Sequence, residues 1–525
     1  MSRRLRWLPV LLAVIALMAG CTVGPSTRPA LATYGEQPAP ISIKPATPAR
    51  PIGPGGKGRS AEPLNWSSCP SGVSDPSKKG ITFSLDCADL AVPLTYTGSD
   101  PSTLDLQVAR ARAANTPKNA PNLVVVLGRP GVNGPDQIAD IAGSMPAALL
   151  ATHSIVTLDL RGTAAEMACF SRQTIIDLLS PPIDPAQNGN GDTLGTFAQE
   201  ASFDCEQRVG ASISEFSSTA AADDLDSLRS ALGTDKLQFL GQGFGATLGA
   251  VYADRYPGRV DRLVLDGPSD PSATLSDAAT SRAVELEKAL DDFAAECSNA
   301  AGGCPLGAHP RTAITTLINT LGDDGIGDQG LLITGGSVLL LLSQLLGDPS
   351  SWPNMYKALA AANGGQGDTD PLVNLLLSTF GLGDSAVDSH LMESRMAYAC
   401  NDSSQRLSGT ALVTASNAAK KAAPTFGAFM VGQASLCSSW PPATSALARL
   451  TAKGAPSIFV AGAVDDPDAP YAGVKAVVSQ LTSASLISWQ SGTHGAFPAS
   501  RCISTAVLAY LAKDTAPATD ALCPP

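Results

Sequence analysis

The chain has 525 residues and a formal net charge of −12; 44% of its residues are hydrophobic and 16% are charged. Its charges form no acidic or basic blocks, so binding to nucleic acid is excluded, because phosphates need a stripe of clustered positive charge. The length is sufficient for one large domain that carries an insertion, or for two domains.

The first 21 residues have the features of an export signal. A basic start leads into an apolar run from Trp7 to Ala19, which is too short to span a bilayer. The run closes with Met18-Ala19-Gly20-Cys21, which resembles the bacterial lipobox. We therefore predict a lipid on Cys21 that holds the protein on the membrane, in the bacterial cell envelope on the outer side of the cytoplasmic membrane. An ordinary cleaved signal and an uncleaved membrane anchor are the alternatives.

The rest of the chain divides by its pattern of predicted elements. Residues 22–62 are rich in Pro, Gly and Ala, which is typical of a disordered tether. Over 63–274, and again over 442–525, short β-rich runs alternate with helical stretches. This predicts an α/β fold with a mostly parallel sheet and helices on both faces. The stretch 275–441 turns helical, and we predict a cap inserted over the carboxyl edge of the sheet, where open α/β folds bind ligands.

Six apolar runs are the predicted strands, because strands buried on both faces of a parallel sheet are hydrophobic throughout. They are Leu123–Leu127, Ile155–Leu160, Leu237–Leu240, Val260–Leu265, Ile458–Ala461 and Leu486–Trp489. A helix is predicted over Ser218–Leu232, with Ser218 and Thr219 as candidate N-caps and Gly233 as its stop.

Ten cysteines remain when Cys21 is set aside for lipid, an even number in a compartment that permits disulfides. Sequential pairing gives five bridges, although the sequence alone does not fix the connectivity: Cys69–Cys87, Cys169–Cys205, Cys297–Cys304, Cys400–Cys437 and Cys502–Cys523. The cysteine spacings are not those of zinc sites, and the four histidines are scattered. We expect no structural metal and no cofactor.

A glycine-rich turn follows the strand predicted at Leu237–Leu240. The turn reads Gly241-Gln242-Gly243-Phe244-Gly245, and a helical run follows over Ala246–Tyr256. Strand, tight turn and helix make the nucleophile elbow of α/β-hydrolases, G-x-S-x-G, in which the serine is the nucleophile. The serine position is occupied here by Gly243.

The elbow and its surroundings resemble the exported tripeptidyl aminopeptidases, serine exopeptidases related to the prolyl aminopeptidases. Beside the elbow, the segments that carry the resemblance are Asp223-Asp224-Leu225, Tyr252-Ala253-Asp254-Arg255-Tyr256-Pro257 and Val264-Leu265-Asp266-Gly267. The resemblance extends from Trp66 to Cys523 and is weakest in the cap. It implies the α/β-hydrolase fold and the chemistry of a hydrolase.

The resemblance also implies an acid and a base for the catalytic triad. In Asp466-Pro467-Asp468-Ala469-Pro470-Tyr471, Asp466 matches the acid, with Asp465 as a fallback. In Gly492-Thr493-His494-Gly495, His494 matches the base. The order of nucleophile position, acid and histidine along the chain is that of other α/β-hydrolases.

The oxyanion hole follows from the same resemblance. The family's glycine-rich loop aligns with Leu127-Gly128-Arg129-Pro130-Gly131, so Gly128, Arg129 and the amide of Phe244 are its predicted members. Arg129 replaces a glycine, and its side chain is expected to crowd the place of the carbonyl. The stretch Asp159-x-Arg161-Gly162-Thr163 also fits the family, although Ala164 and Glu166 stand where glycine and serine are expected.

Glycine has no side chain to acylate, and losing the serine of such a triad lowers the rate about a millionfold. Thr247, one turn into the helix, is expected to face away from His494. We therefore expect an impaired hydrolase that binds a peptide, or a small acyl or amide ligand, under the cap.

Two alternatives stay open. In the first, the protein is an active hydrolase or peptidase in which His494 and Asp466 activate a water molecule. In the second, Gly241 to Ala246 form the G-x-G-x-x-A fingerprint of a dinucleotide-binding protein, with Asp266 as the partner of the ribose.

Overall fold

The computed structural model describes residues 61–70, 77–78, 80–97, 100–328, 331–362, 367–382, 390–513 and 520–525. The predicted export signal with its lipid site Cys21, and all but the last two residues of the predicted tether, lie outside the described residues. Among the described helices, none is long and apolar enough to cross a membrane.

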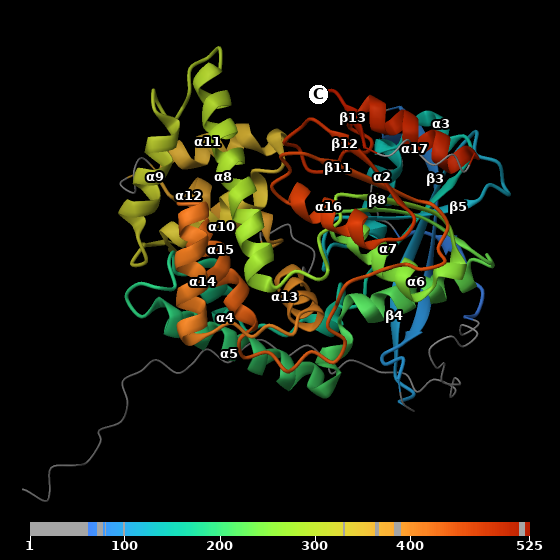
Figure 1. The fold of residues 1–525 in the computed structure, drawn as a ribbon, viewed down its shortest axis with the longest axis horizontal. Coiled ribbons are helices and arrows are strands. Elements are labelled where there is room, and N and C mark those ends of the chain that lie inside the picture. The colour runs from blue at the N-terminus through green and yellow to red at the C-terminus, as the bar shows by residue number, and fades with distance from the viewer. Residues whose placement is uncertain are drawn as a thin grey trace, which may run out of the picture. The chain divides into compact units, whose positions relative to one another are not determined.

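A large sheet forms the centre of the described part of the chain (Figure 1). Its strands run in the order β1-β3-β4-β6-β5-β7-β8-β11-β12-β13, with β2 beside β3. Along this order, all neighbouring strands from β6 to β13 are parallel. The four strands that come first in the chain, β1 to β4, pair with their neighbours antiparallel. The bounds are β1 Ser67–Ser68, β2 Ser77–Lys78, β3 Ile81–Pro93, β4 Thr103–Ala113, β5 Asn122–Leu127, β6 Ser154–Leu158, β7 Leu237–Gln242, β8 Val260–Asp266, β11 Ile458–Ala463, β12 Ala484–Trp489 and β13 Ala521–Cys523.

Helices cover both faces of this sheet, as predicted. On one face lie α2 (Ile138–Ser144), α3 (Ala147–Leu150) and α17 (Arg501–Lys513), and on the other α6 (Ser218–Ala231), α7 (Phe244–Arg255) and α16 (Tyr471–Gln480). The alternation within β5 shows why its sequence is apolar throughout. Leu123 and Val125 pack on the face covered by α2, α3 and α17, while Val124 and Val126 pack on the face covered by α6, α7 and α16.

The six predicted strands are β5, β6, β7, β8, β11 and β12, and their ends differ from the prediction by one or two residues. The long strands β3 and β4 were not predicted. Buried and exposed residues are mixed along both strands, and this breaks the apolar runs from which the other strands were identified. The predicted N-cap of α6 was also wrong by one residue, because Ser217 accepts the amide of Ala220 while Ser218 lies inside the helix.

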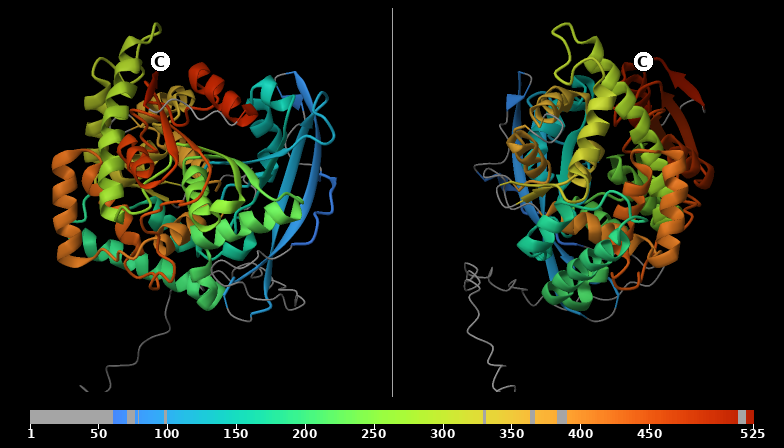
Figure 2. Two further views of the ribbon diagram at one scale, coloured as in Figure 1. Left: turned by 45° about the vertical axis from the view of Figure 1, so that its right-hand side comes forward. Right: turned by 90° about the vertical axis from the view of Figure 1, so that its left-hand side faces the viewer.

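Residues 275–441 are mainly helical and lie on the opposite side of Figure 1 from β3 and β4; Figure 2 repeats this in its left panel. The helices are α8 Leu275–Asn299, α9 Pro310–Leu321, α10 Gly335–Leu345, α11 Trp352–Ala361, α12 Asp370–Thr379, α13 Leu391–Asp402, α14 Gly409–Ala422 and α15 Gly427–Ala434. A small hairpin of β9 (Ile326–Asp328) and β10 (Leu331–Ile333) interrupts them. We call this region the helical segment.

Two earlier helices join the helical segment in space. They are α4 (Arg172–Leu179) and α5 (Asn190–Val209), which precede its first residue by many positions. Leu179 of α4 packs in the same core as the helical segment, and α5 contacts α14. The helices beside the sheet therefore come from two separate stretches of the chain.

The ten predicted disulfide cysteines form five bridges with the sequential pairing: Cys69–Cys87, Cys169–Cys205, Cys297–Cys304, Cys400–Cys437 and Cys502–Cys523. Each joins residues that lie between 7 and 37 positions apart. The bridges therefore fasten neighbouring elements within each region of the chain.

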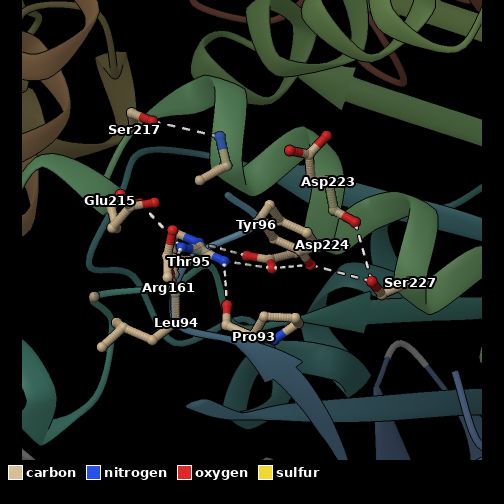
Figure 3. Close-up of polar contacts among 12 residues, drawn as sticks. Pro93, Leu94, Thr95, Tyr96, Arg161, Glu215, Ser217, Asp223, Asp224 and Ser227 are labelled. Atoms are coloured by element: carbon tan, nitrogen blue, oxygen red, sulfur yellow. Dashed lines mark hydrogen bonds and ion pairs between the residues drawn. The ribbon is translucent and has the colours of Figure 1, made fainter. Parts of the chain in front are cut away.

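A buried arginine connects the end of β3 with α6 and with the turn before it (Figure 3). Arg161 is fully buried and donates to both carboxylate oxygens of Asp224, at 2.8 and 2.7 Å. It also donates to the carbonyl oxygens of Pro93, Leu94 and Glu215. Burial would lower the pKa of Arg161, but Asp224 raises it above its usual value. The Asp-x-Arg-Gly-Thr stretch thus supplies a structural ion pair.

Candidate active site

Gly243 lies between β7 and α7, at the carboxyl edge of the sheet. Its φ of 57° and ψ of −116° fall in a region that residues with a Cβ rarely adopt. The glycines on either side allow the turn: a Cβ on Gly241 would lie 2.2 Å from the Gly245 carbonyl oxygen, and one on Gly245 would lie 2.1 Å from that of Val126. The backbone is that of a nucleophile elbow, with glycine at the nucleophile position.

His494 and Asp466 meet at the same edge of the sheet, because they follow the parallel strands β12 and β11. His494 Nδ1 lies 2.9 Å from Asp466 Oδ2. The amides of Asp468 and Ala469 donate to Asp466 Oδ1 at 2.8 and 3.0 Å and hold the carboxylate in place. A Cβ built on Gly243 would lie 3.0 Å from His494 Nε2. The structure thus brings the three predicted positions together.

The two substitute groups considered from the sequence lie elsewhere. The side chain of Asp465 is 48% exposed and faces Lys288 at 3.4 Å, whereas Asp466 is 1% exposed. Thr247 accepts the amide of Ser269 at 2.9 Å, and its hydroxyl points back to the carbonyl oxygen of Gly243. Neither group contacts His494.

The charge on His494 is set by its neighbours. Burial acts to lower the pKa of His494, but the carboxylates of Asp466 and Asp468 outweigh burial and raise the pKa to about 9, with Arg129 opposing them. At pH 7 the imidazole therefore carries a proton on both nitrogens. In that state it can donate a proton to a ligand but cannot accept one from water.

The predicted oxyanion loop follows β5. Gly128 has a φ of 95°, and the guanidinium of Arg129 donates to Asp468 Oδ1 and, at 2.6 Å, to Gln344 Oε1. Phe244 is the first residue of α7, so its amide has no acceptor within the helix. The side chain of Arg129 thus reaches from the loop to Gln344 in the helical segment.

A cavity of about 370 Å³ adjoins the elbow. Phe244 and Thr247 of α7 line it on one side, and Arg282, Gln344 and Arg395 line it from α8, α10 and α13. A second cavity of about 280 Å³ shares Arg282, Gln344 and Arg395 with the first. The elbow therefore opens on a space that continues among the helices.

Sequence patterns did not predict the side chains that join Arg129 by hydrogen bonds in this space. They are Arg282, Gln344, Arg395 and Asp468. The only signal in the sequence was the replacement of a loop glycine by Arg129, which indicated a changed environment without identifying its partners.

The surroundings of Asp266 exclude its predicted alternative role as a ribose partner. Asp266 is 1% exposed and accepts the amides of Ala496 and Phe497 at 3.0 and 2.9 Å. Gln242 donates to the same carboxylate at 3.3 Å. The carboxylate is enclosed by its own chain, so the dinucleotide hypothesis has no acceptor for a ribose hydroxyl. Within the described ranges, no group of His, Cys, Asp or Glu side chains is arranged to hold a metal ion.

Two family models match this chain. The model described as alpha/beta hydrolase fold matches residues 121–319, which include the elbow. The model described as TAP-like protein matches residues 423–523, which include Asp466 and His494. Together they span the two stretches that form the candidate site.

Named relatives agree with these matches. Serine protease Hip1 of Mycobacterium tuberculosis (strain ATCC 25618 / H37Rv) is 28% identical over 510 residues, which cover 89% of this chain and 93% of the relative. Carboxylesterase B of the same strain is 27% identical over 525 residues, 95% of each chain. Tripeptidyl aminopeptidase of Streptomyces lividans is 27% identical over 219 residues, 40% of this chain and 39% of the relative. This chain thus has the α/β-hydrolase fold, and it is similar to the TAP-like proteins, to a serine protease and to a tripeptidyl aminopeptidase.

Proposed function

We propose that this protein is a catalytically impaired member of its family that binds a peptide, or a small acyl or amide ligand, beside the helical segment. The observation that carries the proposal is the glycine that faces the base: a Cβ on Gly243 would lie 3.0 Å from His494 Nε2. Acid, base and elbow are retained, and the atom that would be acylated is missing. Without it, the covalent route is slower by about a millionfold.

The protonation of His494 supports the same function. A triad histidine must take a proton from the attacking group before it can return one to the leaving group. With its pKa raised to about 9 by Asp466 and Asp468, against the effect of burial, His494 carries that proton already at pH 7. The pair of His494 and Asp466 is then a fixed hydrogen-bond donor at the ligand site.

Restoring the serine tests the proposal. We would assay hydrolysis of aminoacyl and tripeptidyl chromogenic substrates, and labelling by a fluorophosphonate, from pH 6 to pH 10. The proteins are the wild type, Gly243→Ser and the double variant Gly243→Ser with His494→Ala. We expect a silent, unlabelled wild type. Gly243→Ser should gain labelling and turnover as the pH rises towards 9, because His494 must lose its proton to act as a base.

The double variant separates restored catalysis from chance reactivity. Its labelling and turnover should return to the level of the wild type, since the new hydroxyl then has no base. Turnover by the wild type, lost in a His494→Ala single variant, would contradict the proposal.

A second candidate function is supported by the intact ion pair of His494 and Asp466. Apart from the neighbouring residues in the chain, His494 is the only described residue within 4 Å of the Cβ position on Gly243. A water molecule there could be deprotonated by His494, and the protein would be a slow hydrolase. Such activity would be absent at pH 7 and would rise towards pH 9 in the wild type, so the same pH series distinguishes the two functions.

We further propose that a lipid on Cys21 anchors the protein to the outer side of the cytoplasmic membrane of a bacterium. The support is the lipobox-like Met18-Ala19-Gly20-Cys21 after a short apolar run. In cells, the wild type should partition into the detergent phase on Triton X-114 separation, and Cys21→Ser should not. Equal partitioning of the two proteins would rule out the lipid.

A further inference from the structure

Three arginines from separate elements meet at the boundary between the two cavities. Arg129 comes from the loop after β5, Arg282 from α8 and Arg395 from α13. All three line the larger cavity, and Arg282 and Arg395 also line the smaller one. We call them the arginine cluster.

Among the described residues, two side chains accept hydrogen bonds from more than one arginine of the cluster, and the carbonyl oxygen of Ser343 accepts a further one from Arg282 at 2.6 Å. Asp468 Oδ1 accepts from Arg129 and, at 2.7 Å, from Arg282. Gln344 Oε1 accepts from Arg129 at 2.6 Å and from Arg395 at 2.8 Å. One carboxylate is thus shared by two guanidinium groups, and the third contacts only the neutral Gln344.

The cluster keeps unused hydrogen-bonding capacity. The Nε atoms of Arg282 and Arg395 are buried and have no hydrogen-bond partner among the described residues. Buried donors in folded proteins are nearly always paired, so each exception needs an explanation, such as a ligand that supplies the acceptor. Burial, and then the charges of Arg129 and Arg282, lower the pKa of Arg395 well below its usual value. An anion in the cavity would offset the positive charge that Arg129 and Arg282 add around Arg395.

The other charged groups of the cavity do not balance the cluster. His494 is paired with Asp466, which leaves Asp468 as the carboxylate in contact with the arginines. Asp270 and Asp402 line the larger cavity but accept other hydrogen bonds, from Ser272 and Gln480 and from Ser218. Burial raises the pKa of Asp402 to about 7, against the hydrogen bonds from Ser218, so it carries only part of a charge at neutral pH.

The smaller cavity gives the anion an apolar neighbour. Beyond the shared polar side chains, its lining is largely aliphatic, aromatic and thioether: Leu178, Leu340, Phe380, Met392, Met396, Met430 and Leu436. A ligand with a charged head at the arginine cluster would therefore place an apolar chain against these residues. An ammonium head would instead meet three guanidinium groups and be repelled.

We propose that the arginine cluster binds an organic anion. The cluster holds the carboxylate or phosphate head of the ligand, and the apolar part of the ligand enters the smaller cavity. This inference rests on the proposed binding function, and it specifies the class of ligand. The ligand presents an acidic group, and not its amine, to the helices.

Binding of simple amphipathic probes to the full chain tests the site. We would measure affinity by calorimetry, and stabilisation by thermal unfolding, with octanoate, octyl phosphate, octyltrimethylammonium and acetate. Octanoate and octyl phosphate should bind, and the tighter of the two identifies the head group. Acetate should bind at least tenfold more weakly than octanoate, because it lacks the apolar chain. Octyltrimethylammonium should show no binding.

Two arginine substitutions connect the result to the cluster. Arg395→Met should weaken octanoate binding at least tenfold, and Arg395→Lys should restore part of the affinity because it keeps the charge. Arg449→Met is the matched control: Arg449 is exposed, bonds the carbonyl oxygen of Ser479 and lies outside both cavity linings, so affinity should not change.

The outcomes separate this inference from the proposed function. If no anion binds, if octyltrimethylammonium binds as well as octanoate, or if Arg395→Met leaves the affinity unchanged, the anion site is refuted. Those results leave the inactive wild type and its rescue by Gly243→Ser untouched. Turnover by the wild type would refute the proposed impairment and would leave the anion measurement standing.

Discussion

Arginine side chains are paired in different ways in two regions of this protein. Arg161, inside the core region, donates to both oxygens of Asp224 and to three backbone carbonyls (Figure 3). Arg395, beside the cavities, donates to the side-chain oxygen of Gln344, and its buried Nε has no hydrogen-bond partner in the part of the chain that the structure describes. The hydrogen bonds of Arg161 are satisfied without a ligand, whereas those of Arg395 are not.

The difference shows how structural and ligand-binding charges can be distinguished. A buried charge is tolerated when hydrogen bonds and a counter-charge replace the lost water. Arg161 meets this condition through residues of its own fold, so its removal should damage folding. Arg395 does not meet it, so its removal should damage binding and leave folding intact. The predictions below test this distinction, from the largest expected effect to the smallest.

Arg161→Met should cause the largest loss of stability. It leaves Asp224, which is 1% exposed, without its cation, and breaking such a buried pair costs about 3–5 kcal/mol. The measurement is the free energy of unfolding in urea at pH 7, with the disulfides intact. A loss below about 1 kcal/mol would show that Arg161 is not needed for stability, even though all of its hydrogen bonds are made within the fold.

The fold was largely predictable from local sequence. Strands buried on both faces, such as β5 and β11, are apolar throughout and stand out as runs. The antiparallel strands β3 and β4 alternate polar and apolar residues and were not predicted. The packing of α5 against α14 depends on contacts between residues far apart in the chain, which no local pattern reports.

The candidate site was predictable only where a motif stands in the sequence. Gly243 was identified by the glycines around it, and His494 by its position after a strand. Arg282 and Arg395 belong to different helices of the helical segment, and neither lies in a recognisable motif. Their proximity depends on how α8 and α13 pack among the other helices, so the anion site required the structure.

His494 tests whether the hydrogen-bond partners of a buried charge, and not its place in the candidate site, decide how much the charge contributes to stability. It lies beside the elbow and is paired with Asp466, and Asp466 and Asp468 outweigh burial to raise its pKa to about 9. Because the folded pKa lies above the unfolded value of about 6.5, His494 should stabilise the fold fully below pH 6.5 and lose that effect as the pH rises through 9. His494→Gln should be less stable than the wild type by about 3 kcal/mol at pH 6.

The measurement is urea unfolding of both proteins at pH 6, 7.5 and 9.5, with the His494 resonance followed by NMR. The gap between the two proteins should close by pH 9.5. A titration midpoint near 6.5 would show that Asp466 and Asp468 do not hold the proton, and would remove one support for the impaired site.

Gly243→Ala adds a side chain beside the cavity without changing any charge, and so separates backbone strain from electrostatics. Its φ of 57° and ψ of −116° disfavour a Cβ, which would also lie 3.0 Å from His494 Nε2. We expect a loss of about 1–2 kcal/mol in the free energy of unfolding. Gly195→Ala in α5 is the control, because a Cβ there meets nothing within 4 Å and alanine favours the helix, so stability should rise slightly. A Gly243→Ala variant as stable as the wild type would show that the elbow is not strained.

Arg395→Met should have the smallest effect on stability, within about 0.5 kcal/mol of the wild type in urea at pH 7. It removes one of three neighbouring positive charges, and the new side chain can pack beside Met392 and Met430 in the smaller cavity. The variant should therefore fold normally while it loses octanoate binding. A loss of several kcal/mol, as for Arg161→Met, would show that Arg395 is a structural residue. Because Gln344 would then be a sufficient partner for a buried guanidinium, unpaired donors would no longer point to a ligand at this place.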